Sequence, residues 1–198
     1  MTFSRPSAPR LAPLARETWG EDTEDALRAG LGGLPRDPVP NVIGTLAHHP
    51  PLAAAFLAYN TMLLRAPILE PRVRELMILR VSWRTGAPYE WLQHVRIARR
   101  LGVTDAEIEA VGAGPSSPVW GALDAELLAA TDQLIDRYRI DDATWASLAE
   151  RLDERQLVEA VFVVGTYTCL AMAFNSFGLE LDADLLAMDV PAMPPSQE

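Results

Sequence analysis

Apolar side chains recur every three or four residues along most of the chain from residue 39 onward. This spacing puts them on one face of an α-helix, whereas the strict alternation typical of a half-buried strand is nowhere sustained. The repeat is clearest in the segment 123–138, where it is carried by Leu123, Leu127, Ala130, Leu134 and Tyr138. The pattern predicts an all-α fold.

Polar residues at the expected helix starts support the division of the chain into separate helices. Thr104 with Glu107, and Asp153 with Gln156, have the spacing of a capping box, in which each residue's side chain bonds the backbone N–H of the other. Asp142 is predicted to cap a short helix. The predicted helices cover residues 22–31, 40–47, 51–64, 73–83, 89–101, 123–138, 144–152 and 153–177, with a further short helix after Thr104.

The chain divides by composition into three predicted parts. Residues 1–38 are rich in proline and are expected to form an N-terminal arm with one short helix; its first 16 residues are predicted to be disordered or to drape over a partner. Residues 39–186 form the predicted helical domain, and residues 187–198 a flexible tail. The most apolar stretch, residues 157–174, still carries Glu159 and several hydroxyl groups, so we expect a buried helix and no membrane span. No apolar segment follows the N-terminal arginines, so no secretory signal is expected and the cytoplasm is the predicted location.

The residue types that are missing narrow the chemistry. All 17 basic residues are arginine, and without lysine a Schiff base with a substrate carbonyl or with pyridoxal phosphate is excluded. The single cysteine, Cys169, can form no intrachain disulfide, redox pair or thiolate zinc site, and we expect it to be a small core residue. No histidine pair has metal-binding spacing, so we expect no metal and no other cofactor. The net charge of −10 argues against nucleic acid or an anionic membrane as partner.

One segment departs from this acidic balance. Residues 72–100 hold seven arginines and only two acids, a local charge of +5. These arginines either form a solvated basic face paired with acids elsewhere, or bind an anionic substrate. Arg80 is the best candidate for the second role, because it shares a helical stripe with apolar residues and a guanidinium can hold a carboxylate through two parallel hydrogen bonds.

The same segment holds the candidate proton-transfer residues. Glu90 and His94 are four residues apart, so on a helix their side chains can meet. A carboxylate beside an imidazole selects its tautomer and suits it to proton transfer. If the helices on either side of residues 84–88 form an antiparallel hairpin, Glu75 also approaches His94, and a buried carboxylate is costly unless it is paired in this way. Without such a partner, a histidine on an apolar helix face is usually a core residue.

Residues 72–103, RVRELMILRVSWRTGAPYEWLQHVRIARRLGV, resemble the core motif of the carboxymuconolactone decarboxylase family, which shares its fold with the alkylhydroperoxidase D-like proteins. The motif reads R-E-L-x-I-L-R, Y-E-W-x-x-H and A-x-x-x-G, and a looser resemblance extends over residues 39–183. It implies an alkylhydroperoxidase D-like helical bundle with a central antiparallel helical hairpin, assembled as a homo-trimer or homo-hexamer. In the family's thiol peroxidase branch a Cys-x-x-Cys pair follows the glutamate; Ala87 and Glu90 occupy those two positions here, so both thiols are missing.

The resemblance also implies a cofactor-free lyase or isomerase that acts by proton transfer on an anionic small molecule, such as a carboxylated lactone or an unsaturated keto acid. In this hypothesis His94 is the general acid/base, and Glu75 or Glu90 orients it. Arg80 would hold a carboxylate or the developing oxyanion. The further predicted substrate contacts are Tyr59, Tyr89 and Trp91.

Two other functions stay open at this point. A peroxidase of the alkylhydroperoxidase branch is disfavoured, because the sulfur chemistry that it needs is missing. A non-catalytic ligand-binding or scaffold oligomer would use Glu75, Glu90 and His94 only as a buried polar network that fixes packing.

Overall fold

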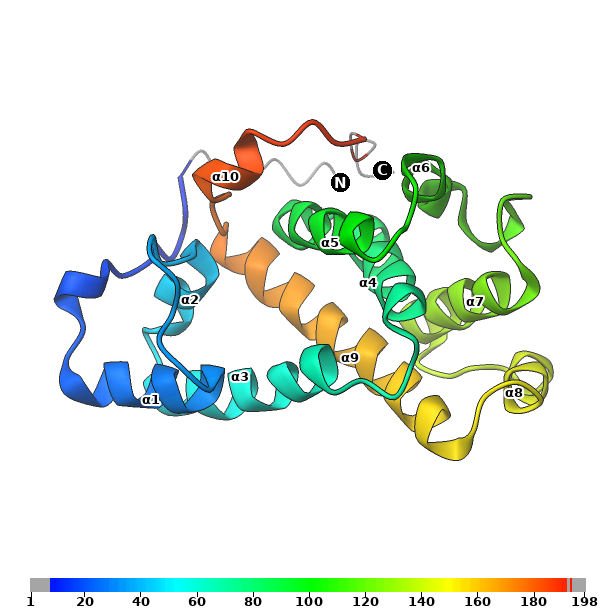
Figure 1. Cartoon of the computed structure of the whole chain (residues 1–198), viewed down its shortest axis with the longest axis horizontal. Coiled ribbons are helices and arrows are strands. Elements are labelled where there is room, and N and C mark those ends of the chain that lie inside the picture. Colours follow the sequence, from blue (N-terminus) through cyan, green and yellow to red (C-terminus); the bar gives the residue numbers. More distant parts are fainter. Residues whose placement is uncertain (1–7, 192, 194–198) are drawn as a thin grey trace. The chain divides into compact units, whose positions relative to one another are not determined.

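The computed structural model describes residues 8–191 and residue 193, and contacts between residues divide the chain into two compact units (Figure 1). The first unit holds residues 1–67 and 174–186, and the second holds residues 68–173 and 187–198. Every regular element of the described residues is helical, which confirms the predicted all-α class. The three-part division at residues 38 and 186 stays a prediction.

The first unit is built around a close helix pair. Its elements are η1 (Arg16–Thr18), α1 (Glu21–Leu31), α2 (Asn41–Leu46), α3 (Pro50–Arg65), the last turn of α9 and α10 (Ala183–Leu186). The helices α1 and α3 pack against each other. Gly30 permits their close approach, because a Cβ there would lie 2.7 Å from the carbonyl oxygen of Ala54.

The described part of the N-terminal arm lies on its own unit. The backbone N–H of Arg10 donates to the carbonyl of Phe177 at 2.8 Å, and that of Leu14 donates to the carbonyl of Gly44 at 3.0 Å. The prediction of a disordered or partner-bound arm is therefore wrong for residues 10–14, whose polar backbone groups find partners within the same chain. Residues 1–7 lie outside the described residues.

Several helices of the second unit begin directly after a capping residue. Its helices are α4 (Pro71–Thr85), α5 (Pro88–Arg100), α6 (Asp105–Ala113), η2 (Gly114–Ser116), α7 (Ala122–Arg137), α8 (Asp142–Ala149) and, up to residue 173, α9 (Glu154–Phe177). Both predicted capping boxes are present, before α6 and before α9. The cap of α8 is one residue earlier than predicted: Asp141, and not Asp142, accepts the N–H of Thr144 at 2.8 Å.

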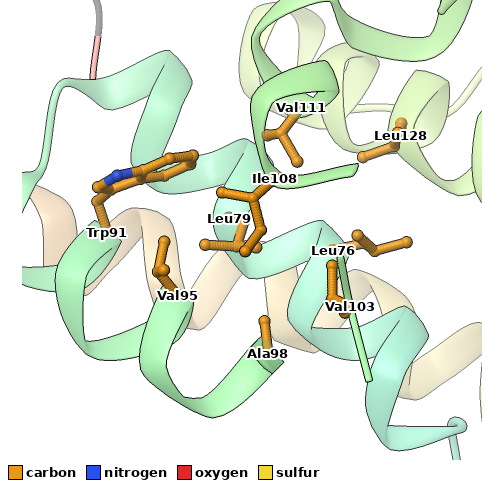
Figure 2. Close-up of a cluster of buried hydrophobic side chains, with 9 residues drawn as sticks. All are labelled: Leu76, Leu79, Trp91, Val95, Ala98, Val103, Ile108, Val111 and Leu128. Atoms are coloured by element: carbon orange, nitrogen blue, oxygen red, sulfur yellow. The ribbon is translucent and has the colours of Figure 1, made fainter. Parts of the chain in front are cut away.

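The predicted hairpin is formed by α4 and α5, which lie side by side (Figure 1). The first helix ends at Gly86, whose φ of +61° suits a residue without a side chain, and Pro88 opens the next helix. Figure 2 shows the apolar cluster that holds the hairpin against the following helices. It contains Leu76, Leu79, Trp91, Val95, Ala98, Val103, Ile108, Val111 and Leu128.

The helix α9 is apolar almost all round. It meets the length and composition of a membrane-crossing helix, a test that core helices also meet, and half of its most apolar window is buried inside the protein. Cys169 is exposed, so its predicted place in the core is wrong. Because apolar residues surround the helix, their spacing does not reveal which face is buried. Its exposed side also carries Val158, Phe162 and Met172, and the predicted homo-oligomer remains a prediction.

The tail after α10 is also attached where it is described. The indole N–H of Trp91 donates to the carbonyl of Pro191 at 3.2 Å, and Arg99 Nη1 donates to the carbonyl of Asp189 at 2.9 Å. Met188 and Val190 pack against the apolar cluster of Figure 2. The flexibility of the tail stays a prediction, and residues 192 and 194–198 lie outside the described residues.

Candidate active site

The hairpin brings the predicted acid and base together. His94 Nδ1 lies 2.6 Å from Glu75 Oε2, although the two residues are 19 positions apart. Glu75 has no exposed surface and His94 is 6% exposed. A contact this short between an imidazole and a buried carboxylate is a charge-assisted hydrogen bond. The hairpin therefore places Glu75 against His94, as expected from the sequence.

The second oxygen of Glu75 is held by its chain neighbour. Arg74 Nη2 and Nε donate to Glu75 Oε1 at 2.7 and 3.1 Å, inside the protein. Burial by itself raises the pKa of Glu75, but the charges and hydrogen bonds of His94 and Arg74 outweigh it, so the pKa lies below its ordinary value. Glu75 is therefore ionised. Because an ionised carboxylate only accepts hydrogen bonds, Nδ1 of His94 carries a proton.

A tyrosine ring packs against the imidazole of His94. The ring of Tyr167, on α9, meets the ring of His94 edge-to-face, with centroids 4.8 Å apart and an interplanar angle of 87°. With Nδ1 bound to Glu75, Nε2 is the nitrogen that can gain or lose a proton. The sequence suggests Tyr167 as one of the residues that shape the pocket, together with Tyr59, Met62 and Asn175, but not as a neighbour of His94.

Glu90 has a different environment from the one predicted. Its carboxyl group was expected to meet His94 one turn away, but no hydrogen bond joins them, and the imidazole bonds Glu75 instead. Glu90 is 1% exposed, and among the described residues neither carboxyl oxygen has a hydrogen-bond partner. Burial raises the pKa of Glu90 well above its ordinary value, and no neighbouring charge offsets this effect. The raised pKa favours the neutral carboxylic acid over the carboxylate.

We expect Glu90→Gln to stabilise the protein at neutral pH. The folded pKa of Glu90 lies above the unfolded one, so the folded chain binds more protons between those two values, and stability falls as the pH rises through that window. Each unit of pKa elevation that the window covers corresponds to about 1.4 kcal/mol. Urea unfolding of both proteins across this range should show equal stability on the acid side and a growing advantage of the variant toward neutral pH. A variant that is less stable at neutral pH would contradict the neutral, unpartnered state of Glu90.

Arg80 is engaged within the chain, and its predicted role in holding a substrate stays a prediction. Its Nε and Nη2 donate to the two carboxylate oxygens of Asp132 at 2.7 and 2.8 Å, and its Nη1 donates to the carbonyls of Val111 and Gly112 at 2.6 and 3.2 Å. All three nitrogens are thus engaged within the chain, and the side chain is buried. The guanidinium holds a carboxylate through two bonds as predicted, but that carboxylate belongs to α7 and not to a substrate.

We therefore expect Arg80→Met to act on stability and not on substrate binding. Losing the bonds to Asp132 should lower the free energy of unfolding by roughly 2–3 kcal/mol, while Arg84, 2.6 Å from Asp132, still pairs with that carboxylate. The control is Arg139→Met, which removes an exposed pair with Asp142 and should cost less than about 0.5 kcal/mol. Urea unfolding measures both. A folded Arg80→Met protein with weakened substrate binding would restore the original prediction.

The same pairing accounts for most of the basic segment. Arg72 pairs with Glu107 and Asp124, Arg84 with Asp132 and Asp136, and Arg99 with Asp105. The segment is therefore largely a basic face neutralised by acids from elsewhere in the second unit. Among the described residues, no three histidine, cysteine, aspartate or glutamate side chains gather as metal ligands would.

The three aromatic residues predicted to contact a substrate lie in three different environments. Trp91 is buried in the apolar cluster, 5.5 Å from the ring of Trp83, so it is a core residue (Figure 2). Tyr89 is buried at the start of α5, where its hydroxyl accepts a hydrogen bond from Gln93 at 3.3 Å. Tyr59 belongs to α3 of the first unit and packs edge-on against Phe56. Substrate contact by Tyr89, Trp91 or Tyr59 stays a prediction.

The region that carries this geometry also matches a known protein family. The model of the carboxymuconolactone decarboxylase family matches residues 50–133, which include Glu75, Glu90 and His94. This match covers less than half of the chain, and over residues 50–133 the chain is similar to the carboxymuconolactone decarboxylase family. No curated protein matches the chain.

Solved structures agree on the fold. An alkylhydroperoxidase D core protein from Ralstonia eutropha, described as an uncharacterized peroxidase-related protein, has a TM-score of 0.73 and 17% identity over 90% of this chain and 96% of its own. A peroxidase-related protein from Silicibacter has a TM-score of 0.70 and 19% identity, covering 93% and 94%. The debrominase Bmp8, in complex with 2,3,4-tribromopyrrole, has a TM-score of 0.71 and 20% identity, covering 89% and 94%. At these identities the likeness confirms the alkylhydroperoxidase D-like fold alone.

Proposed function

We propose that this protein is a cofactor-free enzyme that moves a proton at a carbon next to a carbonyl group, as an isomerase or a decarboxylase. The hydrogen bond of 2.6 Å between His94 Nδ1 and Glu75 carries the proposal. It joins an imidazole to an ionised carboxylate inside the protein, which is the arrangement that a general acid/base needs.

The chemistry follows from this pair. In an isomerisation, Nε2 of His94 removes a proton from carbon, an enolate forms, and the resulting imidazolium returns the proton at another carbon of the conjugated system. In a decarboxylation, loss of CO₂ leaves the same kind of enolate, and the imidazolium supplies the proton. Glu75 stabilises the positive charge of the ring at each stage and keeps Nε2 aimed in one direction. The isomerisation returns the proton that it removes, whereas the decarboxylation consumes one proton, which the imidazole takes up again from water.

A thiol peroxidase remains the weaker alternative. Ala87 and Glu90 occupy the positions of the two thiols, and Cys169 lies on the exposed side of α9. A dithiol mechanism needs a second sulfur to resolve the oxidised one. A peroxide-reduction assay coupled to a dithiol, with the oxidation state of Cys169 followed by mass spectrometry, separates this alternative from proton transfer.

The test of proton transfer uses a panel of unsaturated lactones, conjugated enones and keto acids in D₂O. We expect proton NMR to reveal deuterium entering at carbon, together with a shifted double bond or released CO₂, only when the protein is present. No enzyme-dependent exchange or conversion across the panel, by a folded protein that nevertheless binds panel members, would favour a ligand-binding or scaffold role.

A further inference from the structure

Glu90 is a buried group that the proton-transfer scheme does not use. It lies one turn before His94 on α5, so both side chains leave the same face of the helix. Its two oxygens are buried and lack a hydrogen-bond partner among the described residues, whereas the other acid of the hairpin, Glu75, has both oxygens bonded. Leaving a buried polar group unsatisfied destabilises the folded protein, so a position of this kind needs an explanation.

The charges around the hairpin restrict what can meet this acid. Arg74 and Arg80 are the buried arginines of the described residues, and both already pair with acids, Glu75 and Asp132. A substrate carboxylate brought to His94 would approach the ionised Glu75 and find no buried arginine that lacks an acid partner. A buried charge without a partner is strongly disfavoured, whereas a neutral polar group that accepts one hydrogen bond is not.

We propose that Glu90 is a substrate-binding residue that donates a hydrogen bond, as a neutral carboxylic acid, to the carbonyl oxygen of an uncharged substrate such as an unsaturated lactone or ketone. A protonated carboxyl group kept in an apolar site can stabilise an oxygen on which negative charge develops. The donor then acts on the oxygen while His94, one turn further along α5, acts on carbon. The inference rests on the proposed function and favours isomerisation of a neutral compound over decarboxylation.

The experiment measures binding without turnover. The probes are an unsubstituted butenolide and a cyclic enone, each compared with the same ring bearing a carboxylate, titrated into the full chain and followed by ligand-observed NMR. We expect the neutral probes to bind the wild type at least tenfold more tightly than their carboxylates. Glu90→Gln, whose amide still donates, should bind them about as well as the wild type, and Glu90→Leu about 3–10-fold more weakly. Glu109→Leu, which replaces an exposed carboxylate of the same unit, is the control and should bind unchanged.

A second readout reports directly on Glu90. In protein labelled with ¹³C at glutamate carboxyl groups, the signal that is missing from Glu90→Gln should be that of a neutral acid at neutral pH. An ionised Glu90, equal or better binding of the carboxylated rings, or unchanged binding by Glu90→Leu would each overturn the inference. These outcomes differ from failure of the proposed function, which would appear as the expected binding pattern without proton transfer at carbon.

Discussion

Replacing His94 with glutamine is expected to lower kcat by about 10²–10⁴-fold, the usual contribution of a positioned general acid/base. Glutamine can still hydrogen-bond Glu75, but it cannot take up or release a proton, so the variant removes the chemistry and keeps a polar contact. The measurement is the rate of deuterium entry or conversion with the best panel substrate, in single turnover and at steady state. KM should change little, because His94 acts mainly in the transition state.

The control for this loss is another histidine. His48 Nε2 lies 2.9 Å from the carbonyl oxygen of Ala12. Both residues belong to the first unit, whereas the hairpin belongs to the second. His48→Gln should retain full activity. If His94→Gln keeps its activity and only loses stability, the Glu75–His94 pair is a structural network and the scaffold alternative gains support.

Replacing Glu75 with glutamine is expected to lower the free energy of unfolding at neutral pH by roughly 3–5 kcal/mol, the cost of breaking a buried ion pair from one side. Arg74 loses the carboxylate that accepts two of its hydrogen bonds, and His94 loses the partner that orients it. Activity should fall as well. Urea unfolding followed by circular dichroism measures the stability change, and Glu109→Gln, an exposed carboxylate, should leave it within about 0.5 kcal/mol.

The sign of the pH dependence gives an independent check on Glu75. Its pKa is lower in the folded than in the unfolded chain, so the unfolded chain binds more protons between those two values. The stability that the ionised group contributes is complete above the unfolded pKa and is lost as the pH falls through the folded one. The difference between wild type and Glu75→Gln should therefore shrink in acid. Glu75→Gln that is as stable as the wild type at neutral pH would show that the pair contributes no net stability.

The two acids of the hairpin thus make opposite predictions. Glutamine at position 75 removes a paired charge and destabilises, whereas glutamine at position 90 removes an unsatisfied acid and stabilises at neutral pH. A residue that lowers stability where it stands is typical of functional sites, which conflict with local packing rules. Comparing the two variants in one unfolding series tests both assignments at once.

Short-range rules were sufficient for the helices and for the hairpin. The capping box at Thr104 and Glu107, and the break between Gly86 and Pro88, depend on residues within one turn of each other, so their geometry is contained in local sequence. Once the hairpin forms, the resemblance of the motif and the cost of an unpaired buried carboxylate together place Glu75 against His94. The fold class could be predicted on this basis.

The sequence was therefore sufficient to predict the order of the main helices, and to place an acid and an imidazole on the two arms of one hairpin. The folded structure alone reveals which acid Arg80 binds, because Asp132 is 52 residues away and periodicity carries no information about such pairs. It also reveals that Cys169 is exposed and that Glu90 makes no hydrogen bond with His94. In each case local spacing determines the face of a helix on which a side chain lies, whereas packing between distant segments determines the neighbours of that face.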